Sequence, residues 1–384
     1  MSQPVIVDAI RTPIGKRDGA FRATLPATLL GRVQRRLLQR AGIEPADVGQ
    51  VVGGCVTQVG EQAFNVTRTA WLYAGLPYSV AATTVDCQCG SSQQANHIVD
   101  AMIRAGVIDI GVACGVEVMT RIPMGANTKC GFGQARPEDF PYDMPNQFVA
   151  AERIAKKHGI TRDDADRLGL ISQQRAAEGA SSGRLRQEIE PVEMCSEEGC
   201  APNARVIETD EGIRQTSLEA LARLRPILDG GIHTAGNTSQ ISDGAAAVLW
   251  MDEARARALG FRPRARIFSQ VLVGTDPYFH IEGPIDATRA LLKVSRLSLR
   301  SIDRFEINEA FASVVLAWQR TFGVDEERLN VNGGAIALGH PMGATGARLL
   351  TTALYELERS DGEFALVAMC CGGAVATGTI LQRC

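Results

Sequence analysis

The chain alternates short apolar runs with longer stretches in which apolar residues recur every three or four positions. Residues 51–56 and 108–112 have the length and character of buried strands. Residues 92–105 predict a helix that ends at Gly106. One face of this helix collects Ala95, Ile98, Val99, Met102 and Ile103. Strands that alternate with amphipathic helices predict an α/β fold.

The last third of the chain repeats this plan. A strand is predicted to end at residues 305–308, a helix to occupy 343–356, and a buried strand to occupy 364–369. In each half the order is helix, strand and then a Cys-Gly segment, which is Cys114-Gly115 in the first half and residues 370–373 in the second. We expect a duplicated α/β domain in which each half places a catalytic loop at the carboxyl end of a strand.

The region between the halves has a different composition. Residues 125–145 are rich in Gly, Pro and Asn, residues 146–178 look helical and polar, and residues 179–236 are rich in loop-forming residues. This pattern predicts a cap inserted into the first half. The predicted units are an N-terminal half of residues 1–116 with 244–262, an inserted loop domain of 117–243, and a C-terminal half of 263–384.

Composition narrows the class of protein. The 384 residues are 45% hydrophobic and 22% charged, as in globular proteins, and the formal charge is −3. This charge argues against a nucleic-acid surface or a basic membrane patch. No apolar run approaches the roughly 18 residues of a membrane span. The ten cysteines, without a secretory leader, predict free thiols in a reducing cytoplasm.

Cys89 is the candidate nucleophile. It lies in Asp86-Cys87-Gln88-Cys89-Gly90-Ser91-Ser92, directly before the predicted helix. Backbone N–H groups and the helix dipole at such a position favour a thiolate, so we expect a lowered thiol pKa. A packed core thiol is the alternative, and the local residues do not decide between the two. Cys87 lies at the predicted strand end and is expected to pack.

His340 is the candidate general base. It lies in a glycine-lined loop, residues 332–341, that ends at a predicted helix start. There it could accept the proton of Cys89. Packed or solvated positions are expected for the other histidines, which are His97, His158, His233 and His280.

Residues 370–373 and 308–311 supply the remaining chemistry. Cys370 follows a buried strand, and a thiol with a pKa near 8 could move protons to and from a carbon acid. The Gly372 N–H could help to hold an oxyanion. Asn308 ends a strand, where an amide could hold a water or face a carbonyl oxygen, although asparagine caps are common there. The alternatives of a packed Cys370 and of Cys371 as the acid stay open at this point.

Cofactor motifs are not apparent. The glycines near residue 343 lack the Lys-Ser or Lys-Thr of a phosphate loop, and no dinucleotide-binding fingerprint is present. Cys130, Cys195 and Cys200 do not have the spacing of a structural zinc site. We therefore predict no metal.

Taken together, these motifs resemble the thiolase family over essentially the whole chain. Thiolases carry a nucleophilic cysteine before a Ser-rich helix start, as at Cys89. They also carry Asn-Glu-Ala-Phe (308–311), Gly-His-Pro (339–341) and Cys-x-Gly-Gly (370–373). The resemblance selects Cys370 over Cys371 as the acid. It implies an α/β fold of duplicated domains in five layers (αβαβα), with an inserted loop domain.

The inserted region resembles the thiolase loop domain, and residues 235–245 look like its coenzyme A segment. The resemblance implies that Ser239 contacts the pantetheine and that Arg214 lies near the adenine nucleotide. It also implies that coenzyme A is a co-substrate, that no cofactor is permanently bound, and that the protein is a homodimer or homotetramer. The further residues expected to bind substrate or coenzyme A are Ala235, Ala310 and Phe311.

Residues 85–97 and 231–236 look like those of bacterial thiolases that shorten steroid side chains. Some positions depart from the common family pattern. Asp86 replaces an asparagine, Ala374 replaces a third glycine, and the methionine-glycine pair of the cap is replaced near Gln147-Phe148. These departures bear on chain-length specificity rather than on the reaction.

The resemblance implies thiolysis of a 3-oxoacyl-CoA to acetyl-CoA and a shortened acyl-CoA through an acyl-enzyme on Cys89. The alternatives are a biosynthetic acetoacetyl-CoA thiolase, a decarboxylating ketoacyl synthase, and a non-catalytic lipid- or sterol-CoA carrier. A synthase pairs its cysteine with two histidines, and only His340 is suitably placed for that here.

Overall fold

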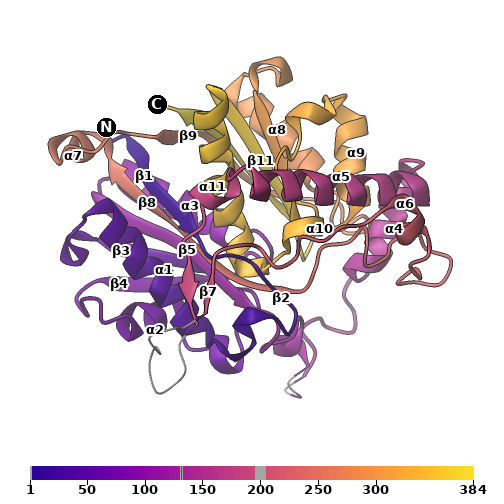
Figure 1. Cartoon of the computed structure of the whole chain (residues 1–384), viewed down its shortest axis with the longest axis horizontal. Coiled ribbons are helices and arrows are strands. Elements are labelled where there is room, and N and C mark those ends of the chain that lie inside the picture. The colour runs from indigo at the N-terminus through magenta and orange to yellow at the C-terminus, as the bar shows by residue number, and fades with distance from the viewer. Residues whose placement is uncertain (1, 130, 132, 195–204) are drawn as a thin grey trace.

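The structure is a computed structural model that describes residues 2–129, 131, 133–194 and 205–384 (Figure 1). Cys130, Cys195 and Cys200 lie outside the described residues.

The N-terminal half forms a mixed sheet in the order β4-β3-β5-β8-β1. β3 is parallel to β4 and β5, whereas β8 is antiparallel to β5 and β1. The strands are β1 (Pro4–Arg11), β3 (Gln50–Gly54), β4 (Ala81–Val85), β5 (Ile110–Val118) and β8 (Ser242–Asp252), and β2 (Gly15–Lys16) pairs with β8.

The C-terminal half forms a second sheet in the order β10-β11-β12-β9. β10 and β11 are parallel, and β12 is antiparallel to β11 and β9. This arrangement matches the order and directions of β3-β5-β8-β1, which confirms the predicted duplication. A single residue pair, Ile6 with Ala265, joins the two sheets. The strands are β9 (Ala265–Gly274), β10 (Arg304–Ile307), β11 (Phe364–Cys371) and β12 (Val375–Arg383).

The helices complete five layers, as the resemblance implied. α1 (Pro26–Ala41) and α2 (Val66–Tyr73) cover the outer face of the N-terminal sheet. α3 (Ser91–Arg104) and α11 (Met342–Ser360) contact each other and both sheets, so they form the middle layer (Figure 1). The outer layer of the other half contains α8 (Pro284–Ser295), which packs on β9 and β12, and α9 (Ala312–Phe322) beside it.

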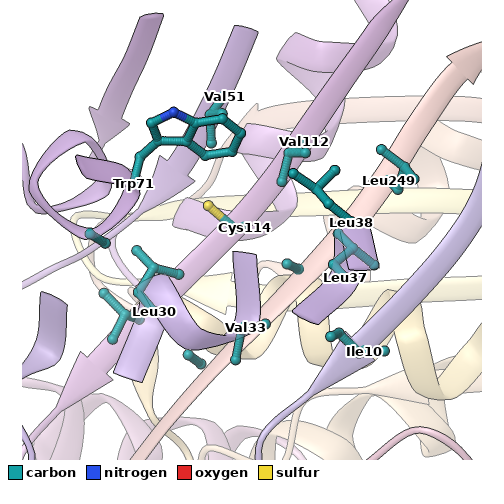
Figure 2. Close-up of a cluster of buried hydrophobic side chains, with 14 of the residues drawn as sticks. Ile10, Leu30, Val33, Leu37, Leu38, Val51, Trp71, Val112, Cys114 and Leu249 are labelled. Carbon is teal, nitrogen blue, oxygen red and sulfur yellow. The ribbon is translucent and has the colours of Figure 1, made fainter. Parts of the chain in front are cut away.

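Apolar side chains hold each outer layer to its sheet. Figure 2 shows the N-terminal cluster, where residues of α1 and Trp71 of α2 meet the strand side chains that point toward these helices. Burying such side chains is worth roughly 1.5–3 kcal/mol each, and this term orients the helices on the sheet. The members labelled in the figure are Ile10, Leu30, Val33, Leu37, Leu38, Val51, Trp71, Val112, Cys114 and Leu249.

The middle layer depends on close backbone approach. A Cβ on Gly346 of α11 would lie 2.2 Å from the backbone nitrogen of Gln93 in α3. A Cβ on Gly115 of β5 would lie 2.1 Å from the carbonyl oxygen of Gly343. Glycine therefore allows α11 to sit tightly between the halves, where it carries the segment that follows His340.

Two predicted strand ends are wrong. The strand predicted over 364–369 continues to Cys371, because Cys370 and Cys371 pair with β12. Cys114-Gly115 was expected to follow its strand. Instead, β5 continues to Val118, because every residue from Val112 to Val118 pairs with β8 and is buried between layers. Cys114 is therefore a core thiol in the middle of a strand.

The segment between β5 and β8 contains α4 (Gln147–Lys157), α5 (Arg162–Ser181), α6 (Leu218–Ala222) and a small sheet of β6 (Val192–Glu193) and β7 (Val206–Ile207). α4 packs on α9, and α5 packs on α9 and on α10 (Ala335–Leu338). The remaining helix, α7 (Glu253–Ala258), follows β8. The segment thus lies against the loops that carry Asn308 and His340.

Candidate active site

Segments near strand ends and a loop between two helices bring most of the predicted catalytic residues to one pocket. Cys89 follows β4, Asn308 follows β10, Cys370 lies near the end of β11, and His340 lies between α10 and α11. Cys89, His340, Cys370 and Gly372 line a single pocket, together with Ser239, Ala310 and Phe311. Residues more than 250 positions apart in the chain therefore meet at one site.

Cys89 is half-buried, at the turn that begins α3. Burial raises the pKa of its thiol to about 12, although the backbone amides of Gly372 and of Cys89 itself lower it. The predicted lowered pKa is therefore wrong, because the loss of hydration outweighs the nearby N–H groups. The thiol is neutral at neutral pH and needs a base.

His340 has a defined tautomer. Its Nδ1 lies 2.7 Å from the Thr345 hydroxyl, and that hydroxyl donates its proton to the Pro341 carbonyl at 2.8 Å. The Thr345 oxygen must therefore accept from Nδ1–H, which leaves Nε2 unprotonated. Burial, with a further contribution from Arg348, lowers the pKa of His340 to about 3, so the imidazole is neutral. The sequence motifs did not identify Thr345. Its position one helical turn after Pro341, where its hydroxyl can bond the Pro341 carbonyl, was a usable signal.

Asn308 lies beside this imidazole. Its Nδ2 is 3.5 Å from Nε2 of His340, and its Oδ1 is buried without a hydrogen-bond partner among the described residues. The side chain is almost fully buried, so it is not a solvated strand cap. It can present an amide donor next to the basic nitrogen of His340.

Cys370 and Cys371 face different surroundings. Cys370 lines the pocket and interacts with Cys89, whereas the Cys371 thiol hydrogen-bonds with Cys87 in the middle layer. Burial raises the pKa of Cys370 well above its usual value, so the predicted pKa near 8 is wrong. Cys370 is thus a protonated thiol at neutral pH, suited to donating a proton to a carbanion.

Glu309 has a structural role in the same motif. Its buried carboxylate accepts hydrogen bonds from Ser172 Oγ at 2.6 Å, from the Ile336 amide at 3.1 Å and from Asn330 Nδ2 at 3.1 Å. A Cβ on Gly334 would lie within 2.6 Å of this carboxylate. Glu309 therefore holds the glycine-rich segment that leads to His340.

The residues expected to bind coenzyme A fall into two groups. The Ser239 amide donates to the Ala310 carbonyl at 3.0 Å, which places Ser239 against residues 310–311 in the pocket lining. Arg214 donates through Nη2 to the Ala235 carbonyl at 3.1 Å. Both Arg214 and Ala235 are exposed, and neither lines the pocket.

The pocket wall is largely apolar. Phe148 packs edge to face on Phe311, with ring centroids 5.4 Å apart. Met119 and Met124 follow β5, whereas Ile281 precedes α8 and Met342 begins α11. These residues have no common spacing in the chain, so the sequence offered no signal for them. The further lining residues are Met119, Met124, Gln147, Thr238, Gln240, Ile241, Ile281 and Met342.

The other histidines pack, as predicted. His97 bonds Thr379 at 2.8 Å, His158 bonds Glu282, and His233 lies between Glu152 and Ser313. His280 is also buried, but its partner is the Gly373 amide, which belongs to segment 370–373, where the sequence predicted catalytic groups.

The described part of the chain contains neither a metal-ligand cluster nor a helix able to cross a membrane. There, no cluster of three or more histidine, cysteine or acidic side chains has the arrangement of a metal site. Within the same residues, no helix combines the length and the apolar character that crossing a bilayer requires.

Comparison with known proteins agrees with this architecture. The thiolase N-terminal domain matches residues 4–254, and the thiolase C-terminal domain matches residues 261–383. The chain therefore belongs to the thiolase family, and it is an acyltransferase of that family.

Individual relatives cover the chain from end to end. A steroid 3-ketoacyl-CoA thiolase, FadA6, of Mycobacterium tuberculosis is 43% identical over 100% of this chain and 95% of its own length. A 3-ketoacyl-CoA thiolase of Klebsiella pneumoniae is 41% identical over 100% of both chains. The crystal structure of an acetyl-CoA acetyltransferase from Bacillus anthracis superposes with a TM-score of 0.91, at 33% identity, over 100% of this chain and 99% of the other.

Proposed function

We propose that the protein cleaves 3-oxoacyl-CoA thioesters by thiolysis, releasing acetyl-CoA and a shortened acyl-CoA. The observation that carries the proposal is that Cys89, His340 and Cys370 line one largely apolar pocket. Two of the relatives named above are 3-ketoacyl-CoA thiolases, which supports this reaction. A non-catalytic carrier is not favoured, because nucleophile, base and acid are all present.

In the proposed first half-reaction, Nε2 of His340 takes the Cys89 proton as the sulfur attacks the 3-keto carbon. The resulting tetrahedral oxyanion collapses, and the bond between C2 and C3 of the substrate breaks. The electron pair of that bond forms the acetyl-CoA enolate, which Cys370 protonates at carbon. The acyl group remains on Cys89 as a thioester.

In the second half-reaction, the Cys370 thiolate takes the thiol proton of an incoming coenzyme A. The coenzyme A sulfur attacks the acyl carbonyl, and Cys89 leaves with the proton held by His340. All groups thereby return to their starting protonation states. Since each step is reversible, the same residues can run the condensation direction.

Two sets of donors are proposed to stabilise the oxygen charges. Asn308 and the protonated form of His340 would hold one developing oxyanion, and the amides of Cys89 and Gly372 would hold the other. The 3.5 Å contact between Asn308 and His340 supports the first set. The influence of both amides on the Cys89 thiol supports the second. Removing one such donor from an enzyme typically costs about 10²–10³-fold in kcat.

The reaction is tested with Cys370→Ala and the matched control Cys371→Ala, assayed on a 3-oxoacyl-CoA. We expect Cys370→Ala to lose roughly 10²–10⁴ in kcat, as for a general acid, while Cys371→Ala loses much less because its thiol faces the middle layer. Mass spectrometry of the wild type should find an acyl adduct on Cys89. Bound ligand without any adduct, or equal losses in the two variants, would contradict the proposed roles.

For the substrate, we propose a bulky 3-oxoacyl chain of lipid or steroid side-chain β-oxidation. The M. tuberculosis relative is named a steroid 3-ketoacyl-CoA thiolase, and the pocket has an apolar wall that includes Met119, Met124, Phe148 and Ile281; both observations support this class. A panel of esters from acetoacetyl-CoA to steroid-bearing 3-oxoacyl-CoA, compared by kcat/KM, decides the matter. A strong preference for acetoacetyl-CoA would favour a biosynthetic thiolase instead.

Coenzyme A is proposed to bind as a co-substrate over the inserted domain, residues 117–243, with the two halves bounded as predicted. β5 ends at Val118 and β8 begins at Ser242, each within two residues of the predicted boundaries, which supports this division. Ser239 in the pocket lining is proposed to contact the pantetheine, and the exposed Arg214, bonded to Ala235, to contact the nucleotide. Arg214→Ala should then raise KM for coenzyme A with little change in kcat.

We also propose a homo-oligomer, a dimer or a tetramer, in which a second copy covers β4. This strand is the edge of the sheet, and the nearby Phe64, Tyr73 and Tyr78 are 96%, 64% and 84% exposed. Tyr78→Arg should weaken association in analytical ultracentrifugation, whereas Val294→Arg, at an apolar residue of α8 that is 66% exposed, should not.

For the location of the protein, we propose the cytoplasm. The cysteines that the structure describes are all free thiols, which suits a reducing compartment.

A further inference from the structure

The turn between β11 and β12 carries an amide of the site. It consists of Gly372, Gly373 and Ala374, and it is closed by the pairing of Cys371 with Val375. Gly373 and Ala374 are both left-handed, with φ of 82° and 58°. The Gly372 amide faces the Cys89 thiol and favours its ionised form. The direction of this N–H group depends on the contacts that fix the conformation of the turn.

Packing at Gly373 does not hold the turn, because the residue is exposed and a Cβ there would meet nothing within 4 Å. The neighbouring loop between β9 and α8 holds it instead. β9 pairs with β12 so that Gly274 lies opposite Val375, which brings this loop beside the turn. Thr275 donates its amide to the Ala374 carbonyl at 2.9 Å. The Gly373 amide donates to Nε2 of His280 at 2.8 Å.

His280 is built into an unusual position. The side chain is 5% exposed, and the backbone is left-handed, with φ of 51°. Such a conformation costs a non-glycine residue roughly 1–2 kcal/mol, so the surrounding structure maintains it. Because a backbone N–H can only donate, Nε2 must be the unprotonated nitrogen, and Nδ1 carries the proton.

Neutral imidazole is required for this contact. Burial lowers the pKa of His280, and nearby Arg136 lowers it further against the opposing effect of the Pro145 carbonyl. The lone pair of Nε2 is therefore available to Gly373 at neutral pH.

We propose that His280 is a positioning residue of the reaction. By accepting the Gly373 N–H, it fixes the turn so that the Gly372 amide stays aimed at the Cys89 sulfur and at the oxygen charge that develops there. His280 touches no reacting atom and acts through the turn. The inference rests on the proposed thiolysis, but its geometric core, the aim of Gly372 at Cys89, does not require turnover.

The test separates this role from simple packing with two variants. His280→Asn suits a left-handed backbone, since asparagine tolerates that conformation, but its side chain is too short to reach Gly373. His280→Gln places an oxygen near the position of Nε2 and keeps an acceptor. His97→Leu is the matched control, because His97 is equally exposed, at 5%, and bonds Thr379 away from the turn.

The readouts are kcat, KM, the melting temperature and the rate at which iodoacetamide alkylates Cys89 at pH 9. We expect His280→Asn to lower kcat by roughly 10–100-fold with KM changed less than about threefold, because an oxyanion donor is misaimed rather than deleted. Alkylation of Cys89 should slow several-fold, while the melting temperature is unchanged or higher. His280→Gln should restore both rates to within about threefold of wild type, and His97→Leu should lower only the melting temperature.

Wild-type kcat and alkylation in His280→Asn would overturn the proposal, as would equal impairment in His280→Gln. A wild-type protein that turns over no 3-oxoacyl-CoA, yet shows the expected alkylation pattern in the variants, would remove the proposed reaction and leave the positioning role.

Discussion

Burial holds the proposed nucleophile and the proposed base neutral. Cys89 has its pKa raised to about 12, and His340 has its pKa lowered to about 3, each chiefly through loss of hydration. A preformed thiolate–imidazolium pair is therefore not the resting state. Proton transfer from sulfur to Nε2 is expected to accompany attack on the substrate, when the carbonyl oxygen can take up the negative charge.

This protonation state predicts the pH dependence of Cys89 alkylation. Since only the thiolate reacts, and the thiol pKa lies near 12, the rate should rise about tenfold per pH unit from pH 7 to 10 without a plateau. The measurement follows the Cys89 peptide by mass spectrometry after timed treatment with iodoacetamide, with Cys89→Ser as the background. A plateau that begins near pH 7 would instead indicate an ion pair with His340.

Thr345 predicts a second effect at the residue scale. Thr345→Val removes the acceptor of the His340 Nδ1–H and frees the ring to rotate or to change tautomer. We expect kcat/KM to fall roughly 10–100-fold, less than the roughly 10²–10⁴-fold contribution of a general base, because the base is misoriented rather than removed, with KM little changed. Thr351→Val is the control, because Thr351 is buried in the same helix and bonds the Ala347 carbonyl at 2.8 Å, as Thr345 bonds Pro341. Similar activity in the two variants would exclude a role for Thr345 in orienting His340.

At the scale of elements, the chemistry depends on loops that the sheets place at one edge. β10 and β11 are parallel, so Asn308 and Cys370 emerge at the same edge of the C-terminal sheet. The β11–β12 turn is the tightest of these loops, and it places a non-glycine residue, Ala374, in the left-handed region. The contacts of Thr275 and His280 with the turn offset this strain.

Ala374→Gly should therefore stabilise the protein. Removing the strain of a left-handed alanine raises the free energy of unfolding by about 1–2 kcal/mol. Glycine is more flexible in the unfolded chain, which lowers the free energy of unfolding by about 0.5–1 kcal/mol. The expected net gain is roughly 0.5–1 kcal/mol in chemical denaturation, with kcat unchanged. Ala376→Gly, in the extended strand β12 next door, should lower stability, and a loss in both variants would show that Ala374 is unstrained.

At the scale of the whole molecule, the middle layer joins the halves through buried charge as well as apolar packing. Glu306 of β10 and Arg348 of α11 are almost fully buried. Neither the carboxylate oxygens of Glu306 nor the terminal nitrogens of Arg348 have a hydrogen-bond partner among the described residues. Burial raises the pKa of Glu306 to about 8, although Arg348 lowers it. The folded state therefore favours a protonated Glu306.

This raised pKa has a definite consequence for stability. The contribution of Glu306 is fully present below its unfolded pKa, near 4.5, and is lost as pH rises toward about 8. The free energy of unfolding should thus fall between pH 5 and 9 by up to several kcal/mol more in the wild type than in Glu306→Gln. Urea denaturation of both proteins at several pH values measures the difference.

Glu356 provides the opposite case for the same experiment. It is buried nearby, and its ion pairs with Arg304 and Arg359, together with Asn332, hold its pKa below the usual value despite burial. Its contribution to stability is present above its unfolded pKa, so Glu356→Gln should lose stability at neutral pH and little in acid. The outcome that would contradict the role of Glu306 is the same for either comparison. If the free energy of unfolding of wild type and of Glu306→Gln falls equally as pH rises, Glu306 is not the source of the pH dependence.

The sequence by itself determined the family and the duplicated α/β plan, and it singled out Cys89, Asn308, His340 and Cys370 as the candidate catalytic residues. Such residues can be recognised because a catalytic loop at a strand end leaves a local signature of glycines, proline and flanking apolar runs. The periodicity of apolar residues likewise located β3, α3 and β5 in the first half and β10, α11 and β11 in the second.

Only the tertiary structure decided how these groups behave. The pKa directions of Cys89 and Cys370 were wrongly predicted, because they depend on hydration that distant layers remove. The continuation of β5 past Gly115 depends on its pairing with β8. Thr345 and His280 act through hydrogen bonds set by packing, and the pocket wall unites loops that are remote in the chain. Local sequence motifs identify a functional group, but the residues packed around it in the fold determine its charge, its tautomer and its orientation.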